Sequence, residues 1–417
     1  MIKNFLISCA CLLSLSAYTQ QSGTVSPYSF FGIGDFRSNG TVETQMMGGL
    51  QTFGDSIHIN LLNPAAYSKI KLTTYAAGVS NTTTRLVDTE EAQNISFGNL
   101  DYLGIAFPIS KKAGVGFGLL PLSSVGYALN VSNDETTNAF TGNGGISRVF
   151  FSVGFEPIKN LSFGATINYN FGLLEYNRLQ TVENVQFGTL NNRDSRVTGF
   201  DFNYAVDYTK KLNKKHSLTV HVGIDTQANL VSDNAERLGS FSVNNGQEIE
   251  VIDVDLSASN LERTDLKVPT RTTLGLGFGE DRKWFLGAEY SFQEFSSFEN
   301  DFLGITNVAY EDANSVILGG FYIPNYSSFS SYLNRVTYRA GLRYDQTGLI
   351  VNNEQINNFG ITFGFGLPLG NSFSNLNLGF ELGRRGTTDS GLIEENYLII
   401  NLGLSLNDKW FNKRKIN

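Results

Sequence analysis

The sequence predicts an all-β fold: a 14-stranded antiparallel transmembrane β-barrel with an N-terminal hatch or plug in its lumen. Apolar residues alternate with small or polar ones in segment after segment from about Leu72 to Leu406. After Thr19 no run of about 18 apolar residues occurs, which excludes membrane spanning by helices but not by strands. Charged residues make up only 17% of the 417 residues, while the chain has 43 glycines, 32 phenylalanines and 18 tyrosines. This interleaving of apolar and polar residues is what a barrel in lipid needs.

The first element, residues 1–19, is predicted to be a secretory signal peptide. Lys3 supplies the positive start, Phe5 to Leu15 the apolar run, and Ala17-Tyr18-Thr19 a small-residue cleavage site. Both cysteines of the chain lie inside this segment, so the mature protein has no disulfide and no cysteine metal site. We therefore expect a protein that leaves the cytoplasm and, as a barrel, resides in the outer membrane of a Gram-negative bacterium.

The second element, residues 20–71, is predicted to be the hatch. It precedes the first strand, lacks the alternation and is punctuated by glycine and proline. Its apolar side chains favour burial over a solvated periplasmic tail; they include Phe30, Phe31, Ile33, Met46, Met47, Leu61 and Leu62. Because fourteen strands enclose a space that their own side chains do not fill, this segment is the natural plug.

The third element, residues 72–406, is predicted to be the barrel. From Ser217 to Asp225, for example, apolar side chains take one face and small or polar ones the other. The even number of strands returns the C-terminus, with a periplasmic tail over residues 407–417, to the side of the N-terminus. The fourteen predicted strands are Leu72–Thr82, Ser96–Phe107, Ala113–Ala128, Gly145–Phe155, Leu161–Phe171, Val197–Thr209, Ser217–Ala228, Arg271–Phe278, Trp284–Phe292, Ser315–Ile323, Arg335–Tyr344, Asn357–Leu367, Asn375–Gly383 and Tyr397–Leu406.

The predicted connections alternate between short and long, which supports the strand count. Short turns are expected at the periplasmic side and long loops outside. The long loops would be Asn130–Gly144, Leu173–Ser195, Leu230–Thr270 and Glu294–Asn314, and aromatic girdles would include Tyr102, Tyr127, Trp284, Tyr290 and Tyr344. A soluble β-sandwich is the competing interpretation, but it would not expose so much Phe and Leu on every strand.

Two short motifs in the hatch segment carry a family resemblance. Met47-Gly48-Gly49, followed by Asp55 and then Asn63-Pro64-Ala65, resembles the N-terminal hatch of FadL-type outer-membrane transporters. The Ser26–Gly34 opening, Pro121–Tyr127 and the Trp410-Phe411 ending are similar to the Bacteroidetes-type branch of that family. The hatch motif residues are thus Gly48, Gly49, Asn63, Pro64 and Ala65.

The resemblance implies a hatch-plugged barrel for passive uptake or binding of hydrophobic small molecules such as fatty acids, which would occupy the lumen together with detergent in a purified sample. Outer-membrane lipids would surround it. The same branch also resembles barrels that no longer transport and serve as accessory subunits of outer-membrane secretion or protein-assembly complexes, with other envelope proteins as partners. The sequence does not choose between these two functions, because loops carry partner information without short motifs.

One charged constellation is a candidate ligand site. Arg335, Arg339 and Arg343 share the polar face of one predicted strand and could meet a ligand carboxylate inside the barrel. The alternative, which we favour, is pairing with luminal acids such as Glu289 and Glu381, since a buried cation without a partner is costly.

Neither an enzyme nor a nucleic-acid-binding protein is expected. Ser217, His221 and Asp225 are triad residue types on one face, but positions four apart on a strand are separated by about 13 Å, too far for the contacts of a triad. The remaining histidines are scattered, so no metal site and no cofactor are predicted. A formal net charge of -8 argues against nucleic acid as a partner.

Overall fold

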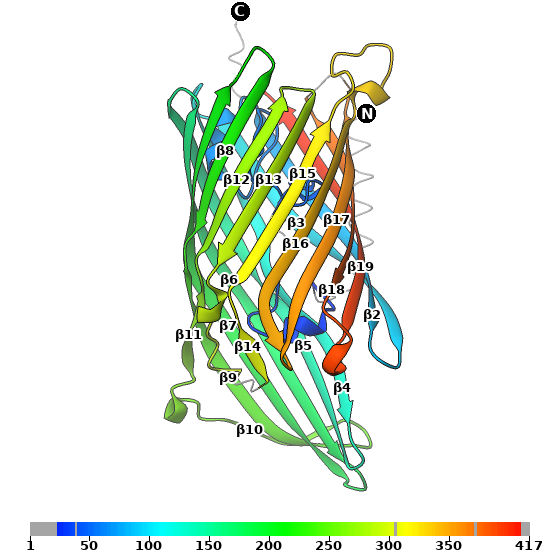
Figure 1. The fold of residues 1–417 in the computed structure, drawn as a ribbon. Helices are drawn as coiled ribbons and strands as arrows, with labels where there is room; N and C mark the ends of the chain where they lie inside the picture. The colour runs from blue at the N-terminus through cyan, green and yellow to red at the C-terminus, as the bar shows by residue number, and fades with distance from the viewer. Residues whose placement is uncertain (1–22, 38–39, 304–306, 371–372, 410–417) are drawn as a thin grey trace, which may run out of the picture.

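The computed structural model describes residues 23–37, 40–303, 307–370 and 373–409, and forms a closed, antiparallel β-barrel (Figure 1). Fourteen strands make the wall, as predicted, and β19 closes it by pairing with β2 along its whole length. The predicted signal peptide and most of the C-terminal tail lie outside the described residues. The wall strands are β2 (Thr73–Val87), β3 (Ala92–Pro108), β4 (Ala113–Ser132), β5 (Thr136–Ile158), β6 (Leu161–Val182), β7 (Phe187–Lys211), β8 (His216–Asp225), β12 (Arg271–Glu280), β13 (Trp284–Gln293), β15 (Ala313–Tyr322), β16 (Thr337–Val351), β17 (Glu354–Pro368), β18 (Asn375–Arg385) and β19 (Glu394–Asp408).

Apart from β9, which has 15 residues, the remaining elements are short. They are η1 (Pro27–Phe30), β1 (Asp35–Phe36), α2 (Val42–Gln45), η2 (Pro64–Lys69), β9 (Ala228–Ser242), β10 (Glu248–Asp253), η3 (Ser257–Ser259), β11 (Arg263–Val268), η4 (Phe295–Ser297), β14 (Val308–Tyr310), η5 (Leu333–Arg335) and η6 (Asp389–Gly391). Among the described residues no helix has the length and apolar character needed to cross a membrane.

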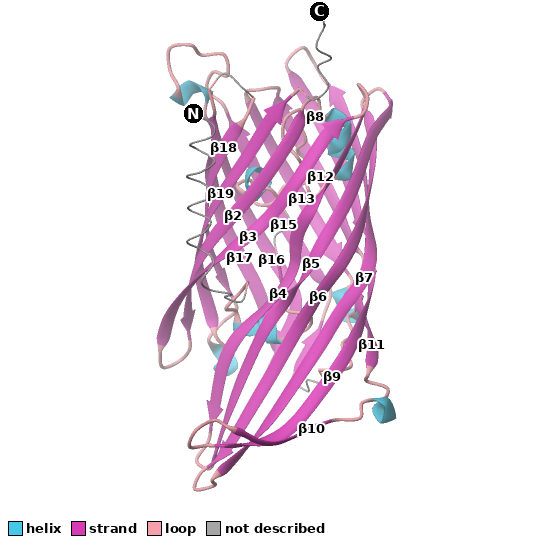
Figure 2. Ribbon diagram, turned by 180° about the vertical axis from the view of Figure 1, so that it is seen from behind, coloured by secondary structure: helices cyan, strands magenta, loops and turns pink. Residues whose placement is uncertain are grey.

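Three of the four predicted long loops are wrong, because the wall strands continue through them. β4 pairs with β5 out to Ser132, β6 with β7 out to Gln180, and β9 and β11 prolong β8 and β12. Figure 2 shows these strands projecting well beyond the rest of the barrel at the bottom of the view. We call the part of β4 to β7 and β9 to β11 that projects in this way the extended wall. Of the four predicted long loops, the connection from β13 to β15 is the one that the structure confirms as a long loop.

The extended wall marks the outer side of the barrel. Thr73 at the start of β2 pairs with Asp408 at the end of β19, so both ends of the barrel sequence lie at the opposite side. That opposite side carries the short turns 109–112, 159–160, 212–215 and 281–283, and the side on which both chain ends of an outer-membrane barrel lie is the periplasmic side. The outer mouth is covered by the β13–β15 loop, whose Phe295 and Phe298 pack in one apolar cluster with Ile33 of the hatch segment and with the extended wall.

Two of the predicted interfacial aromatics lie inside instead. Tyr102 is only 2% exposed and its hydroxyl accepts a hydrogen bond from the backbone N–H of Val42, while Tyr127 joins the cluster at the outer mouth. The reason is a register shift in each strand, at Gly78/Val79 in the β2–β3 pair and at Pro121/Ser123 in the β4–β5 pair. One extra residue turns every following side chain to the other face.

Residues 23–71 fill the lumen, in line with the predicted plug. Val42, Met46, Ile59, Tyr67 and Ile70 are buried in a cluster whose other buried members come from the barrel wall. Glycines in the wall admit this segment. A Cβ at Gly164 would overlap Pro64, and one at Gly379 would overlap the Met46 side chain. A Cβ at Gly341 would overlap the backbone of Met47 and Gly48. Other glycines at which a Cβ would press on the hatch are Gly116, Gly154, Gly319 and Gly403.

The hatch also completes the wall at one seam. β3 pairs with β4 only from Leu103 to Pro108, so the two strands separate toward the outer side. There β1 pairs with β4, with Asp35 opposite Ser124 and Phe36 opposite Ser123. The hatch thereby supplies hydrogen-bond partners to a strand edge that the wall leaves open.

Candidate functional site: the luminal cavity and the tip of the extended wall

The first anchor of the hatch is Glu289 on β13. Its Oε1 accepts hydrogen bonds from Gln51 N at 2.7 Å, Thr52 N at 2.6 Å and Thr52 Oγ1 at 2.5 Å. Glu289 is only 4% exposed. A buried carboxylate with three donors is stabilised by them, and each of those donors would be left unpaired without it.

The second anchor is Asp207 on β7. Asn63 Nδ2 donates to both Asp207 oxygens at 3.1 Å, His221 Nδ1 of β8 lies 2.8 Å from Oδ1, and Lys69 Nζ lies 3.5 Å from Oδ2. Asn63 also caps η2 by accepting from Ala65 N at 2.9 Å. The predicted Asn-Pro-Ala motif therefore starts a short helix, places Pro64 at its first turn and fixes that helix to the wall.

A third contact lies within the hatch, between Asp55 and His58. His58 Nδ1 is 2.6 Å from Asp55 Oδ2. Burial lowers the pKa of His58, but the charge and hydrogen bond of Asp55 outweigh it, so that the pKa is raised. For Asp55, burial raises the pKa and His58 lowers it, with a net decrease. Both shifts favour the charged pair.

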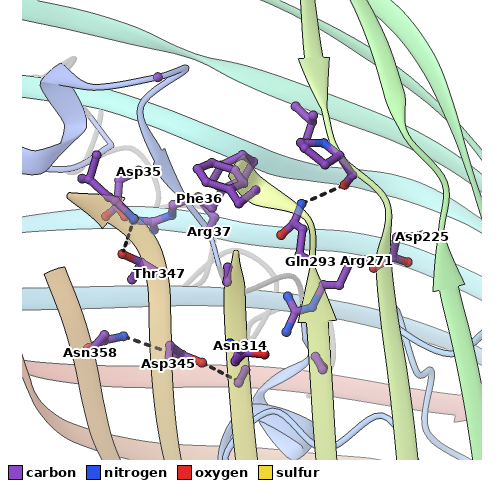
Figure 3. Close-up of a pocket in the computed structure, with 18 of the residues that line it drawn as sticks. Asp35, Phe36, Arg37, Asp225, Arg271, Gln293, Asn314, Asp345, Thr347 and Asn358 are labelled. Carbon is purple, nitrogen blue, oxygen red and sulfur yellow. Dashed lines mark hydrogen bonds between the residues drawn. The ribbon is translucent and has the colours of Figure 1, made fainter. Parts of the chain in front are cut away.

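Between the hatch and the outer half of the wall lies a cavity of about 400 Å³ (Figure 3). One part of its lining is apolar and comprises Phe31, Ile33, Phe36, Val268, Phe292, Phe295 and Leu349. The other part is charged and mostly paired: Arg148 with Asp201 at 2.6 Å, Arg343 with Asp345 at 3.0 Å, and Arg385 with Asp35 at 2.7 Å. The cavity is thus amphiphilic rather than purely apolar.

Arg271 is the exception among the cations of this cavity. It points from the start of β12 into the cavity (Figure 3) and, within the described part of the chain, has no carboxylate within 4.0 Å and no side-chain hydrogen bond. Its neighbour Asp225 is already bonded to Asn203. A guanidinium in this setting can hold a ligand carboxylate or phosphate.

The three predicted arginines do not form one ladder. β16 begins at Thr337, so Arg335 lies in η5 at the periplasmic rim, with its guanidinium 5.4 Å from the Tyr332 ring. Arg339 is buried and donates to Asn377 at 3.0 Å. Arg343 is the only one of the three that lines the cavity, and its Nη2 also reaches Glu381 at 2.7 Å.

The predicted glycine pair of the hatch has a clear structural role. Gly48 and Gly49 adopt positive φ angles of 76° and 97°, and Gly48 N donates to Thr362 Oγ1 of β17 at 3.0 Å. A Cβ at Gly48 would press on the backbone oxygen of Leu342. Only glycine combines this backbone conformation with so close an approach to the wall.

Several cavity residues escaped the sequence analysis, namely Asp35, Arg37, Arg148, Arg271 and Arg385. The sequence signal for these residues was weak: by the alternation of their strands, Arg148 and Arg271 fall on the luminal face. Which strands meet across the lumen is a property of the closed barrel. In the part of the chain that is described, no cluster of three or more His, Cys, Asp or Glu side chains could hold a metal ion.

A second feature lies at the tip of the extended wall. Outward side chains on β5, β6 and β7 are apolar up to Val149, Leu173 and Phe200, and then turn polar at Asn143, Glu175, Asn177, Asp194 and Arg196. At the tip beyond this belt, exposed apolar side chains occur again, and two of them, Val182 and Phe187, have the luminal parity of β6 and β7. We call them the tip patch: Val182 (41% exposed), Val185 (48%), Phe187 (49%), Val243 (43%), Ile249 (56%) and Ile252 (58%).

Solved structures with this architecture define the class. The CymD monoaromatic hydrocarbon channel matches with a TM-score of 0.59 at 14% identity, covering 91% of this chain and 99% of CymD. A Pseudomonas aeruginosa FadL homologue matches at 0.58 and 11%, covering 88% and 98%. The Pseudomonas putida toluene transporter TodX matches at 0.58 and 15%, covering 90% and 99%. The fold is therefore that of FadL-type outer-membrane barrels, as the hatch motifs indicated.

Within that class, a family model narrows the assignment. The BamG family model matches residues 1–417, and the chain belongs to the BamG family. No curated protein matches the chain.

Proposed function

We propose that this protein is a hatch-closed outer-membrane barrel that serves as an accessory subunit of an envelope protein complex. The observation that carries the proposal is the tip patch. Six apolar side chains stand exposed beyond the polar belt. Exposed apolar groups gathered in this way mark a protein interaction site more often than a solvated surface.

The closed lumen supports a role that does not depend on conduction. The hatch is fixed to the wall at Glu289 of β13 and at Asp207 of β7. On the side of the barrel opposite β7, Glu43 of α2 accepts a hydrogen bond from Asn377 of β18 at 2.8 Å. A hydrocarbon crossing the lumen would separate these buried charged groups from their partners, at a cost of several kcal/mol for each. The outer mouth is covered by the β13–β15 loop as well.

The test is native mass spectrometry of the protein extracted from its own membrane in mild detergent. We expect a stoichiometric complex in the wild type and a lone barrel in the double variant Val185→Asp/Phe187→Asp. Thr189→Asp is the matched control, because Thr189 is exposed on the same strand but polar. A wild-type chain that is always alone, or a partner equally retained by both variants, would refute the proposal.

A second function is favoured by the cavity itself: binding of a small amphiphile. Arg271 lies opposite Asp225 and interacts with it electrostatically, but has no carboxylate within 4.0 Å in the described chain. It faces a partly apolar chamber of about 400 Å³, which suits a molecule with an anionic head and a short apolar chain, such as a fatty acid. Arg343, predicted from the sequence as a ligand residue, would help hold the head. Denaturing mass spectrometry of the purified barrel should show an acid that is lost in Arg271→Ala and retained in Arg282→Ala, at the periplasmic rim. Equal amounts in both variants would exclude Arg271 from ligand binding.

A further inference from the structure

We propose that the periplasmic loop between β15 and β16 is a docking element that inserts Phe329 into an apolar pocket, bordered by acidic groups, on a periplasmic protein. This inference rests on the proposed function, since it assigns a second docking surface, on the opposite side of the membrane from the tip patch. The loop covers residues 323–336. The other described periplasmic turns, such as 109–112, 159–160 and 281–283, are much shorter.

The loop exposes its large aromatic and aliphatic side chains to solvent. Phe329 at the apex is fully exposed at 105%, Leu333 is 65% exposed and Tyr332 is 44% exposed. In Figure 1 the loop that precedes β16 stands clear of the barrel rim. Such an arrangement has no benefit for the stability of this chain, because a fully exposed Phe buries nothing.

The loop is nevertheless held in one shape. Asn325 N donates to Asn334 O at 2.8 Å across the base, and Ser328 N donates to Asn325 O at 3.2 Å. Tyr332 Oη donates to Pro368 O of the neighbouring turn at 3.1 Å. A preorganised loop pays less ordering entropy when a partner binds.

The composition argues for a protein pocket rather than for the lipid surface. Phe329 is flanked on each side by two serines, in the order Ser327-Ser328-Phe329-Ser330-Ser331. A segment that inserts into hydrocarbon gathers several apolar residues, and the serine hydroxyls would lose their hydrogen bonds there. A fully exposed aromatic side chain whose neighbours in sequence are small and polar, with the partly exposed Tyr332 and Leu333 beside them, matches the anchor of a protein interface.

The charges near the loop specify the kind of partner. The loop contains Arg335 and no acid, and the Arg282 guanidinium lies 5.3 Å from the Tyr326 ring at its side. The turns along the same rim and the residues beside them add more cations than acids: they carry Lys111, Lys112, Lys159, Lys210, Lys211, Lys214, Lys215 and Lys283 against Glu156, Glu280 and Asp281, the last of which lies 4.0 Å from Arg282. An acidic border around the pocket would complement this rim and speed association.

The experiment is site-specific photo-crosslinking in intact cells, with p-benzoylphenylalanine placed at position 329 of the full chain. We expect one discrete protein adduct, none from the matched periplasmic position Lys214, and an adduct yield reduced at least about tenfold when Leu333→Ser and Arg282→Glu are added. An adduct of lipid mass only, no adduct, or a yield unchanged by both substitutions would overturn the inference.

A separate comparison distinguishes this failure from that of the proposed function. If position 329 gives no protein adduct while the tip variants still release a stoichiometric partner, only the periplasmic docking element is wrong. If the tip variants release nothing and the adduct at 329 persists, the docking element stands and the outer interface falls.

Discussion

The hatch and the tip of the extended wall both contain large apolar side chains, but the hatch buries them and the tip exposes them. In the hatch, every charged anchor described above has a partner, and its apolar residues such as Met46 and Met47 are at most 1% exposed. At the tip, strands pair well through their backbones but leave Phe187 and Ile252 uncovered. The two regions differ in what covers their apolar side chains: the barrel wall covers those of the hatch, whereas the tip leaves its own exposed.

Gly341→Leu should have the largest effect, because it removes the seat of the hatch. A side chain there would overlap the backbone of Met47 and Gly48, which has no room to move between β16 and β17. We expect a loss of about 3 kcal/mol or more, seen as new trypsin cleavage at Lys69 while the barrel still resists heat in gel electrophoresis. Gly98→Leu, on the outer face of β3, is the control and should remain resistant. Equal resistance of both variants would show that the hatch is not held by close approach.

Glu289→Ala tests whether the hatch depends on its charged anchors. It leaves Gln51 N, Thr52 N and Thr52 Oγ1 without their acceptor. An unsatisfied buried donor costs about 1–3 kcal/mol, so the thermal midpoint in detergent should fall clearly. Glu289→Gln keeps an acceptor and should lose less. If the two variants melt together, the carboxylate charge and not its hydrogen bonding sets the effect.

The Asp55–His58 pair makes the hatch sensitive to pH. The raised pKa of His58 means that its stabilisation is complete below the unfolded value of about 6.5 and is lost as the pH rises through the raised value. The lowered pKa of Asp55 means that its contribution is lost only in acid, as the pH falls through the lowered value. The stabilisation by the pair therefore spans mildly acidic to neutral pH.

His58→Gln provides the measurement. The difference in thermal midpoint between wild type and His58→Gln should be larger at pH 6 than at pH 9, because the wild type alone loses the charged pair on going alkaline. A difference that stays constant across this range would mean that His58 acts by packing alone.

The barrel was predictable because lipid imposes a pattern on the sequence. A wall strand such as β8 must alternate, and glycines such as Gly164 must stand where the hatch approaches, so both leave a local signal. The strands of the extended wall have no such local signal in the sequence. Its strands are polar on the outer face near Glu175 and Arg196, where backbone pairing and not lipid decides the structure, and polar strands look like loops in a sequence.

The site was less predictable because it joins residues from distant strands. Asp207 and Asn63 are 144 positions apart, and Arg385 and Asp35 are 350 apart. The face of a residue also depends on bulges that have no sequence signature, as Tyr102 shows. The sequence favours pairing of the three arginines of the predicted strand 335–344 with luminal acids. One of them, Arg343, does contact Glu381.

The smallest effect is expected at the tip, and it sharpens the comparison with a matched residue type. Ile249→Ser and Ile252→Ser remove side chains that are more than half exposed. The free energy of unfolding, derived from the shift of the thermal midpoint, should therefore change by no more than about 0.5 kcal/mol. Ile317→Ser, at a position 5% exposed beneath Met47, should lose at least about 2 kcal/mol. The same substitution then separates a surface that stabilises this chain from one that awaits a partner. A tip isoleucine that proved as costly as Ile317 would mean that the tip patch is covered by the chain itself, and its role in docking would have to be abandoned.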